Sequence, residues 1–327
     1  MNRRQLLIAL GASALTMPLA SFAQQQSKVW RIGFLGAASA SGFAHRVEAL
    51  RAGLRDLGYV EGKNIVIEFR WAEGKYERLP ELAAELIRLK VDVIVTHGPV
   101  GSPAAKNATT TIPIVVTAVG DPVALGLVAS LARPGGNVTG MASLSPEVTA
   151  KRLELLKDAF PRTRRVAVLL NPDNPLLIGP SLRAMEATAA PRKLELHQFE
   201  VRVPGDLDNA FAVMAKRRVD AVVVLDDPVL VAYYGAIAKL AAKMRLPSIG
   251  LGEFAEAGGL MAYGVNRLEV FHRAATFVDK ILKGAKPADL PVEQASRFET
   301  VLNLKTAKAL GIQFPQAILA RAERVIE

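Results

Sequence analysis

The chain has 327 residues, with 41 lysines and arginines against 31 acidic residues, a formal net charge of +10 and no cysteine. The lack of cysteine excludes a disulfide scaffold and thiolate metal sites, and a chain of this length buries enough apolar surface to fold without them. The charge alone would suit nucleic acid, but the basic residues are scattered among acids and form no arginine-rich arm, so we expect no nucleic-acid partner.

The first 23 residues have the pattern of an export signal. Arg3 and Arg4 precede a mostly apolar stretch at 6–19, and Ser21-Phe22-Ala23 supplies small residues where a signal peptidase cuts. The apolar stretch is too short and too interrupted to span a membrane. We expect cleavage after Ala23 and a periplasmic protein, exported by the general or the twin-arginine route. Loss of two arginines and no acid leaves 10 − 2 = +8 on the mature chain.

Runs rich in valine and isoleucine then alternate with segments of helical length. Continuous apolar runs are typical of parallel strands that are buried on both faces. The stretch at 44–57 stops at Gly58, which suits a helix end, and 78–89 is amphipathic. The alternation predicts βαβ architecture. The expected strands lie at 32–35, 65–69, 91–95, 114–119, 166–170, 196–200 and 221–225.

A pattern in the first half of the chain recurs in the second half. In both 83–96 and 212–225 a helical segment ends in a basic residue, a valine and an aspartate, and a valine-rich strand follows. The matched aspartates are 220 − 92 = 128 residues apart. We therefore expect an α/β protein of two similar doubly wound parallel-sheet lobes with a ligand cleft between them. Asp92 and Asp220 stand at the amino ends of strands, where turn or capping roles are expected.

Three passages marked by glycine or proline, at 133–140, 257–264 and 286–292, predict that the chain crosses between the lobes more than once. Several short crossings form a multi-strand hinge, because a few residues absorb the rotation while each lobe stays rigid. The expected first lobe is 28–141 plus 266–288. The expected second lobe is 142–265 plus 289–327.

Candidate ligand-binding residues follow from the rule that ligands meet the loops at the carboxyl ends of parallel strands. Hydroxyl groups and helix-N-terminal amides there suit a carboxylate, and acidic side chains suit an ammonium group. The candidates in chain order are Ser39, Thr96, His97, Gly98, Asp121, Asn171, Asp226 and Glu253.

Structural roles compete with ligand binding at several of these positions. Asp121-Pro122 and Asp227-Pro228 are also typical helix starts, with aspartate as the N-cap and proline at the first helical position. Asn171 precedes a proline and suits a turn. His97 is either part of the cleft or a neutral surface histidine.

Enzymatic sites have little support in the sequence, so we expect no catalytic residue, no metal and no cofactor. The four histidines are far apart, and neither a nucleophile elbow nor a phosphate-binding loop of the Walker type occurs. Gly250-Leu251-Gly252-Glu253-Phe254-Ala255 matches the dinucleotide fingerprint. It falls late in the second lobe rather than after a first strand, which makes a dinucleotide-dependent enzyme a weak alternative.

Six segments in order, at 53–64, 71–80, 119–123, 131–140, 256–264 and 303–311, resemble the tryptophan/aromatic-type solute-binding subunits of ABC importers. One of them reads Val119-Gly120-Asp121-Pro122-Val123. The resemblance covers essentially the whole mature chain and implies a type I periplasmic-binding-protein fold. It departs from the family at His97, where relatives often carry a small residue.

The resemblance also implies a mechanism. A monomeric, non-catalytic receptor would capture a small polar ligand, an amino acid or an aromatic carboxylate, in the interlobe cleft. It would then close and deliver the ligand to permease and ATPase subunits at the inner membrane. The alternative is a ligand-sensing periplasmic module that reports to a membrane receptor.

Overall fold

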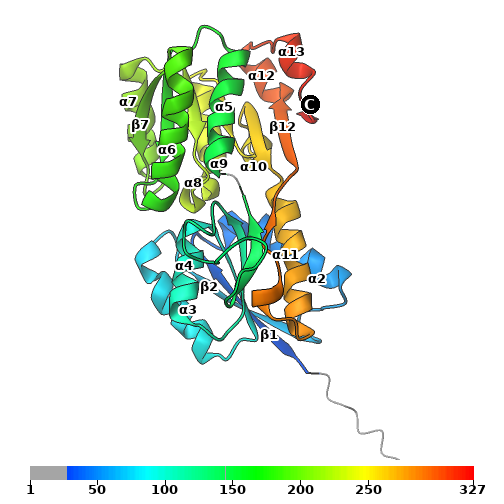
Figure 1. The fold of residues 1–327 in the computed structure, drawn as a ribbon. Coiled ribbons are helices and arrows are strands. Elements are labelled where there is room, and N and C mark those ends of the chain that lie inside the picture. The colour runs from blue at the N-terminus through cyan, green and yellow to red at the C-terminus, as the bar shows by residue number, and fades with distance from the viewer. Residues whose placement is uncertain (1–27, 144) are drawn as a thin grey trace, which may run out of the picture.

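The computed structural model describes residues 28–143 and 145–327, which form two α/β lobes stacked along one axis (Figure 1). The predicted export signal at 1–23 lies outside the described residues. Within the described ranges, no helix combines the length and the apolar character that crossing a bilayer requires.

The first lobe is a six-stranded parallel sheet covered by helices on both faces. Its strands, in the spatial order β11-β5-β4-β3-β1-β2, are β1 (Trp30–Gly36), β2 (Ile65–Trp71), β3 (Val93–His97), β4 (Ile114–Val119), β5 (Val138–Ala142) and β11 (Glu293–Gln294). Its helices are η1 (Ser41–Phe43), α2 (Ala44–Asp56), η2 (Tyr76–Arg78), α3 (Leu79–Arg88), α4 (Gly98–Ala108), α11 (Arg267–Leu282) and η4 (Pro287–Asp289).

The second lobe has a seven-stranded sheet that is parallel except where β12 runs against β10. Its strands, in the order β13-β12-β10-β9-β8-β6-β7, are β6 (Arg165–Leu170), β7 (Glu195–Glu200), β8 (Ala221–Val224), β9 (Ser248–Gly250), β10 (Met261–Val265), β12 (Phe298–Asn303) and β13 (Arg324–Ile326). Its helices are α5 (Ser145–Ala159), α6 (Pro175–Ala189), η3 (Ala190–Arg192), α7 (Asp206–Arg217), α8 (Pro228–Ala232), α9 (Tyr234–Lys243), α10 (Gly252–Glu256), α12 (Leu304–Leu310) and α13 (Gln316–Leu319).

The predicted doubly wound α/β fold is confirmed, and each predicted strand lies on an observed one with small shifts at the ends. The central strands β3 and β8 are buried at every position, because helices cover both faces of each sheet. Packing of these valine-rich strands between helices forms the core of each lobe.

The internal repeat has a structural basis in Asp92 and Asp220. The Asp92 carboxylate accepts the backbone N–H of Arg31 at the start of β1, at 2.8 Å. The Asp220 carboxylate accepts the backbone N–H groups of Arg164 and Arg165 at the start of β6, at 2.7 and 2.8 Å. Each aspartate therefore ties the first strand of its lobe to the third, as expected for turn residues.

The chain crosses between the lobes three times, between β5 and α5, between β10 and α11, and between β11 and β12. The expectation of more than one crossing is confirmed, but none of the three expected passages is itself a crossing. The passages at 133–140 and 286–292 lead into β5 and β11 on the first lobe, and 257–264 leads from α10 into β10 inside the second lobe. The segment from 289 was expected in the second lobe, but β11 pairs with β5 of the first sheet, so the second lobe resumes only at β12. Thr139 Oγ1 donates to the Leu290 carbonyl at 2.7 Å and helps hold this segment on the first lobe.

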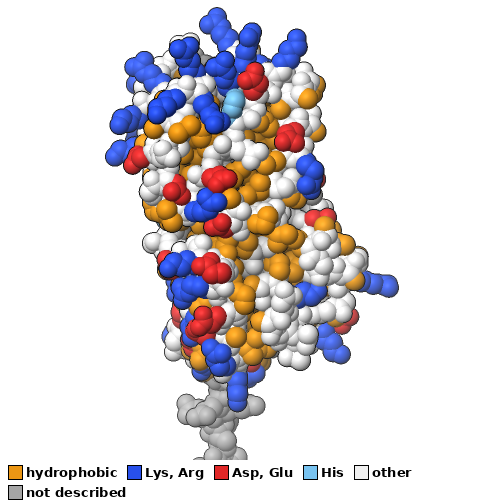
Figure 2. Space-filling model, turned by 90° about the vertical axis from the view of Figure 1, so that its left-hand side faces the viewer, with side chains coloured by type: hydrophobic (Ala, Val, Ile, Leu, Met, Phe, Trp, Pro, Cys, Tyr) orange, Lys and Arg blue, Asp and Glu red, His pale blue; other side chains and the backbone are white. Residues whose placement is uncertain are grey.

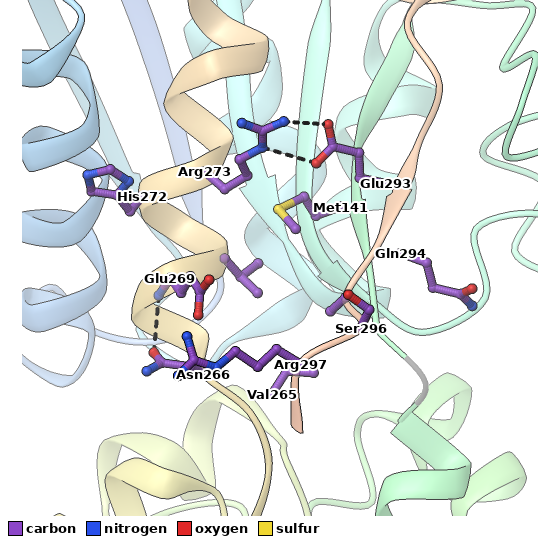
Figure 3. A pocket seen from close by; sticks show the side chains of 12 residues that line it. Met141, Val265, Asn266, Glu269, His272, Arg273, Glu293, Gln294, Ser296 and Arg297 are labelled. Carbon is purple, nitrogen blue, oxygen red and sulfur yellow. Dashed lines mark hydrogen bonds and ion pairs between the residues drawn. The ribbon is translucent and has the colours of Figure 1, made fainter. Parts of the chain in front are cut away.

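The second and third crossings lie side by side and enclose a cavity of about 320 Å3 at the hinge (Figure 3). Arg273 of α11 forms a two-point ion pair with Glu293 of β11, at 2.9 and 3.0 Å. Asn266 caps α11 by accepting the backbone N–H of Glu269. Both α11 and β11 are thus anchored on the first lobe. We expect the lobes to rotate about the short links that join these two elements to β10 and β12 of the second lobe.

Candidate functional site

The carboxyl ends of both parallel sheets face the seam between the lobes, and the lobes are in contact there. The 3₁₀ helix η1 of the first lobe lies against α8 of the second. A β-carbon added to Gly42 would stand 2.6 Å from the β-carbon of Ala232. The structure is therefore a closed form, and any residue at the seam is sensitive to lobe opening.

A buried charge cluster occupies the centre of the seam. Arg152 of α5 is fully buried and holds Asp226 through two hydrogen bonds of 2.6 and 3.1 Å. Arg267, the first residue of α11 in the other lobe, reaches the same carboxylate at 3.4 Å. These arginines hold the pKa of Asp226 below its usual value, although burial works in the opposite direction. Asp226 is therefore an ionised partner of two arginines rather than a free carboxylate.

A second ion pair joins the lobes directly. Arg46 of α2 donates from Nε and Nη2 to Glu253 of α10, at 2.7 and 3.0 Å. The side chains are 7% and 20% exposed, so water screens this pair only partly. Burial opposes the charge on Arg46, but Glu253 outweighs it and the pKa of Arg46 is raised.

His97 lies beside these arginines and is buried. Its ring stacks on Phe43 with 4.4 Å between ring centroids, and its Nε2 accepts the backbone N–H of Ala37 at 3.4 Å. Burial, together with Arg46 and Arg267, lowers the pKa of His97 to about 3. The ring is therefore neutral, and the alternative of a surface histidine is wrong.

The cluster has an unbalanced charge. Among the described residues it contains the three guanidinium groups of Arg46, Arg152 and Arg267 and the two carboxylates of Asp226 and Glu253. Nη1 of Arg267 is buried and has no hydrogen-bond partner in the part of the chain that the structure describes. Burial lowers the pKa of Arg267. This surplus of positive charge makes the seam a favourable place for an anionic group.

A third polar group surrounds Asp227. Tyr76 of the first lobe donates its hydroxyl to both carboxylate oxygens at 2.9 Å. Asn171 and Asn174 of the second lobe donate to the same carboxylate at 3.1 and 2.8 Å. Asp227 also accepts the backbone N–H of Val229, so its predicted role as an N-cap is confirmed. Asn171 is buried and holds the carboxylate of this N-cap residue.

Beside the charged groups, the seam contains a cavity of about 370 Å3 with walls from both lobes. The amino ends of α4 and α6 face it, and neither helix is capped by a side chain. Ser181 lines the cavity. Its Oγ and the Oδ1 of Asn174 are buried and have no hydrogen-bond partner within residues 28–143 and 145–327. The lining is Pro99, Gly120, Asp121, Ala124 and Leu125 from the first lobe, and Pro146, Pro175, Leu176, Leu177, Gly179, Pro180, Ser181 and Arg183 from the second.

A β-bulge positions Asp121 at this cavity. The register of β4 and β5 shifts between Val116 and Val119, and Ala118 adopts the left-handed conformation with φ +54°. Bulges of this kind re-aim the residues that follow and are common at binding sites. Asp121 accepts the backbone N–H groups of Val123 and Ala124 in a turn. The predicted helix start at Asp121 is wrong, because no helix follows. The residue is exposed and lines the cavity.

The eight predicted residues therefore fall into different places, with Asn171 held at Asp227 as described above. His97, Asp226 and Glu253 meet in the charge cluster, and Asp121 lies at the cavity. Ser39 accepts the backbone N–H of Gly42 near the seam. Thr96 is buried and donates to the Leu35 carbonyl, and Gly98 starts α4 with φ +69°. These last two shape the β3–α4 turn.

The arginines of the cluster were missed by reasoning from loops, because all three lie inside or at the start of helices. Their spacing carried a signal. Arg46, Arg152 and Arg267 each lie four residues before a buried apolar residue of the same helix, Leu50, Leu156 and Phe271 respectively. Residues four apart share a helix face, so each arginine lies on a buried face, where an unpaired charge is not tolerated.

The candidate metal ligands and the glycine fingerprint can be located in the structure. Within the described residues, no group of three or more histidine and acidic side chains could hold a metal ion. The glycine fingerprint at 250–255 leads into α10, whose first turn carries Glu253 in its ion pair with Arg46.

Comparison with known proteins places the chain in a family. The model of the family described as "ABC transporter substrate binding protein" matches residues 32–326. A tyrosine-binding protein from Clostridioides difficile (strain R20291) is 29% identical over 264 residues, which cover 80% of this chain and 74% of that protein.

Two solved structures are similar over 91% of this chain. One, a conserved domain protein from Vibrio cholerae, has a TM-score of 0.82 and 28% identity over 100% of its own chain. The other, an ABC domain from Streptococcus pneumonia in complex with L-Trp, has a TM-score of 0.81 and 26% identity over 99% of its own chain. The family match spans nearly all of the described residues, and the chain belongs to the ABC transporter substrate-binding protein family.

Proposed function

We propose that the chain is the periplasmic, non-catalytic binding component of an ABC importer and that it captures an amino acid with an apolar, aromatic side chain. The observation that carries the proposal is the interlobe cavity with Asp121 on one wall and Arg183 on the other. A zwitterion needs one group of each sign, and an aromatic side chain needs an apolar lining.

The contacts of each ligand group follow from the lining. Asp121 is exposed at the mouth, where it suits the ligand ammonium. Arg183 forms no ion pair within the described residues, and the uncapped amino ends of α4 and α6 add partial positive charge, which suits the carboxylate. Leu125, Leu176 and Pro180 offer apolar contacts to the side chain.

The relatives support this ligand class. One curated relative is a tyrosine-binding protein, and one similar structure is a complex with L-Trp. A cavity of about 370 Å3 lies in the size range of small-molecule sites. Tryptophan, tyrosine and phenylalanine are the first ligands to test.

The mechanism is a population shift between open and closed lobes. A ligand that touches Asp121 in one lobe and Arg183 in the other gains both contacts only when the lobes are closed. Its differential affinity for the closed form then determines the fraction of closed protein that a permease and its ATPase meet. No bond is made or broken in this cycle.

Thermal unfolding with a panel of ligands tests the proposal. L-tryptophan, L-tyrosine and L-phenylalanine are compared with tryptamine, which lacks the carboxylate, and indole-3-propionate, which lacks the ammonium group. A ligand at 100 times its dissociation constant stabilises the folded protein by about 2.7 kcal/mol, which a melting curve resolves. Stabilisation by the amino acids but not by the two analogues is expected. If none of the three amino acids stabilises the protein, the proposed ligand class is refuted.

Variants at the cavity assign the charges. Asp121→Asn and Arg183→Gln should each weaken the binding of L-tryptophan, because each removes one of the two charges that the zwitterion needs. Arg88→Gln, at an exposed arginine on the last turn of α3, is the matched control. Equal affinity of Asp121→Asn and the unaltered protein for L-tryptophan would remove Asp121 from the site.

Uptake of the ligand by cells with and without the chain tests delivery.

A further inference from the structure

The end of the second lobe that faces away from the seam carries a concentrated positive charge. Figure 2 shows lysine and arginine side chains gathered at that end of the molecule, at the top of the view. They come from the four segments that precede β6, β7, β8 and β9. Because these strands are parallel, the segments meet at one edge of the sheet, opposite the edge that faces the cavity. We name this surface the basic pole; it comprises Arg162, Arg164, Arg165, Arg192, Lys193, Lys216, Arg217, Arg218, Lys243 and Arg245.

Local acidic residues neutralise little of this charge. Asp220 directs its carboxylate to backbone N–H groups of Arg164 and Arg165, and Glu195 lies 3.8 Å from Arg165. Arg192 pairs with Glu154 of α5 at 2.9 Å. Among the described residues, the other eight cations of the pole have no ion-pair partner, and all eight are exposed.

The matching end of the first lobe carries fewer unpaired cations. Counted in the same way, the helix ends, loops and strand starts at β1 to β4 carry Lys28, Arg31, Arg55, Lys63, Arg88, Lys90 and Lys106. Three of these form ion pairs, Lys28 with Asp92, Arg31 with Glu68 and Arg55 with Glu48. Among the described residues this leaves four cations without an ion-pair partner, against eight at the basic pole. Helix dipoles act in both lobes, so they do not account for the excess in the second lobe.

Three of the basic residues occupy positions that favour glycine. Lys193, Arg218 and Arg245 follow helices and adopt the left-handed conformation, with φ of 54°, 51° and 54°. Glycine or asparagine is the less strained choice at such a helix end. All three side chains are exposed, so their charges lie at the surface of the basic pole. The first lobe has one cation in such a position, Lys90, with φ of 52°.

We propose that the basic pole binds the anionic surface of a phospholipid bilayer. The charge is spread over four loops rather than along a groove, and a planar array of phosphate groups matches such a broad surface. The inference rests on the proposed function, because an exported importer subunit faces the membrane that holds its permease. The seam lies at the other edge of the sheet, so binding at the pole leaves the ligand cavity open and keeps the receptor near the membrane.

The test measures co-sedimentation of the exported protein with vesicles. Vesicles of phosphatidylglycerol and phosphatidylethanolamine are compared with vesicles of phosphatidylcholine alone, at low and at physiological ionic strength. Binding to the anionic vesicles alone, weakened by salt, is expected. No binding to anionic vesicles at low salt would overturn the proposal.

A pair of variants with equal net charge separates the pole from overall charge. The pole variant carries Arg162→Gln, Lys193→Asn, Arg218→Asn and Arg245→Asn, with asparagine where the left-handed conformation must be kept. The control carries Lys63→Gln, Arg88→Gln, Lys90→Asn and Arg133→Gln, all exposed on the first lobe; Lys90 is also left-handed, with φ +52°. We expect vesicle binding roughly tenfold or more weaker for the pole variant and little changed for the control. Equal loss in both would overturn the proposal.

Two further measurements complete the test. The pole variant should bind the ligand with the same affinity as the unaltered protein. Vesicle binding and ligand binding are measured separately, so the membrane proposal and the proposed ligand class can fail independently. Binding of duplex DNA that is tighter than vesicle binding at the same salt, and lost in the pole variant, would assign the pole to polyanions rather than to the bilayer and would overturn the proposal.

Discussion

Replacement of Glu253 by glutamine tests whether the charged seam controls lobe closure. Glu253 of the second lobe and Arg46 of the first form the two-point ion pair that joins the lobes directly. Glutamine keeps the size of the side chain and removes its charge. In the closed form Arg46, which is 7% exposed, would then be left without a carboxylate.

The size of the effect follows from the burial of the pair. Loss of one partner of an exposed ion pair costs about 0–1 kcal/mol, and loss of one partner of a fully buried pair costs about 3–5 kcal/mol. With 7% and 20% exposure the pair lies between these limits, so about 2 kcal/mol is expected. Opening of the lobes hydrates Arg46 and relieves this cost. The change therefore shifts the closed-to-open ratio by about 30-fold rather than unfolding either lobe.

Small-angle X-ray scattering and ligand titration measure the shift. The Glu253→Gln protein should have a larger radius of gyration without ligand, bind its ligand about 30-fold more weakly at most, and become compact again at saturation. The control is Glu256→Gln on the same helix, which pairs with Arg324 inside the second lobe; those side chains are 43% and 39% exposed. Unchanged scattering and affinity in Glu253→Gln, with a lower melting temperature, would show that the pair stabilises the fold and not the closed state.

Other changes at the seam have defined outcomes. Gly42→Ala should hold the lobes apart without lowering the stability of either lobe, because its β-carbon would lie 2.6 Å from Ala232; normal compaction with ligand would contradict this. Tyr76→Phe removes the hydroxyl that bonds Asp227 across the seam and should weaken ligand binding by a factor of about ten, whereas Tyr233→Phe should not. For His97, the pKa of about 3 in the folded protein lies below the ordinary 6.5, so the unfolded chain takes up a proton first and stability falls as the pH drops below 6.5. His97→Gln should remove up to about 1.4 kcal/mol per pH unit from that slope between pH 6.5 and about 4.5, in urea unfolding; an unchanged slope would mean that His97 is protonated in the fold.

The fold could be predicted from the sequence because its signals are local. Valine-rich runs of five or six residues mark β3 and β8, and the recurring aspartates at 92 and 220 mark the repeat. The third crossing could not be placed in this way. Pro287 and Pro291 look like a passage between lobes, but β11, only two residues long, pairs with β5 and keeps the chain on the first lobe.

The site could be predicted only where it lies in loops. The rule that ligands meet the carboxyl ends of strands found Asp121, Asp226 and Glu253, because those residues directly follow strands or turns. It could not show that Asp226 is neutralised by Arg152 and Arg267, which are separated from it by 74 and 41 residues in the chain. Partners of this kind depend on how helices from two lobes meet.

The composition of the seam bears on how such a receptor can respond to a few kcal/mol of ligand binding. Burial of ion pairs costs almost as much desolvation as it gains in attraction, so a charged seam fixes the geometry of closure without strongly favouring it. A seam of apolar residues of equal area would favour the closed form by about 25 cal/mol per Å2 and would leave the ligand little to add. Arg267 works in the same direction, since its buried Nη1 has no hydrogen-bond partner among the described residues and its burial in the closed form is costly. The same arginines that join the lobes thus keep closure dependent on the ligand.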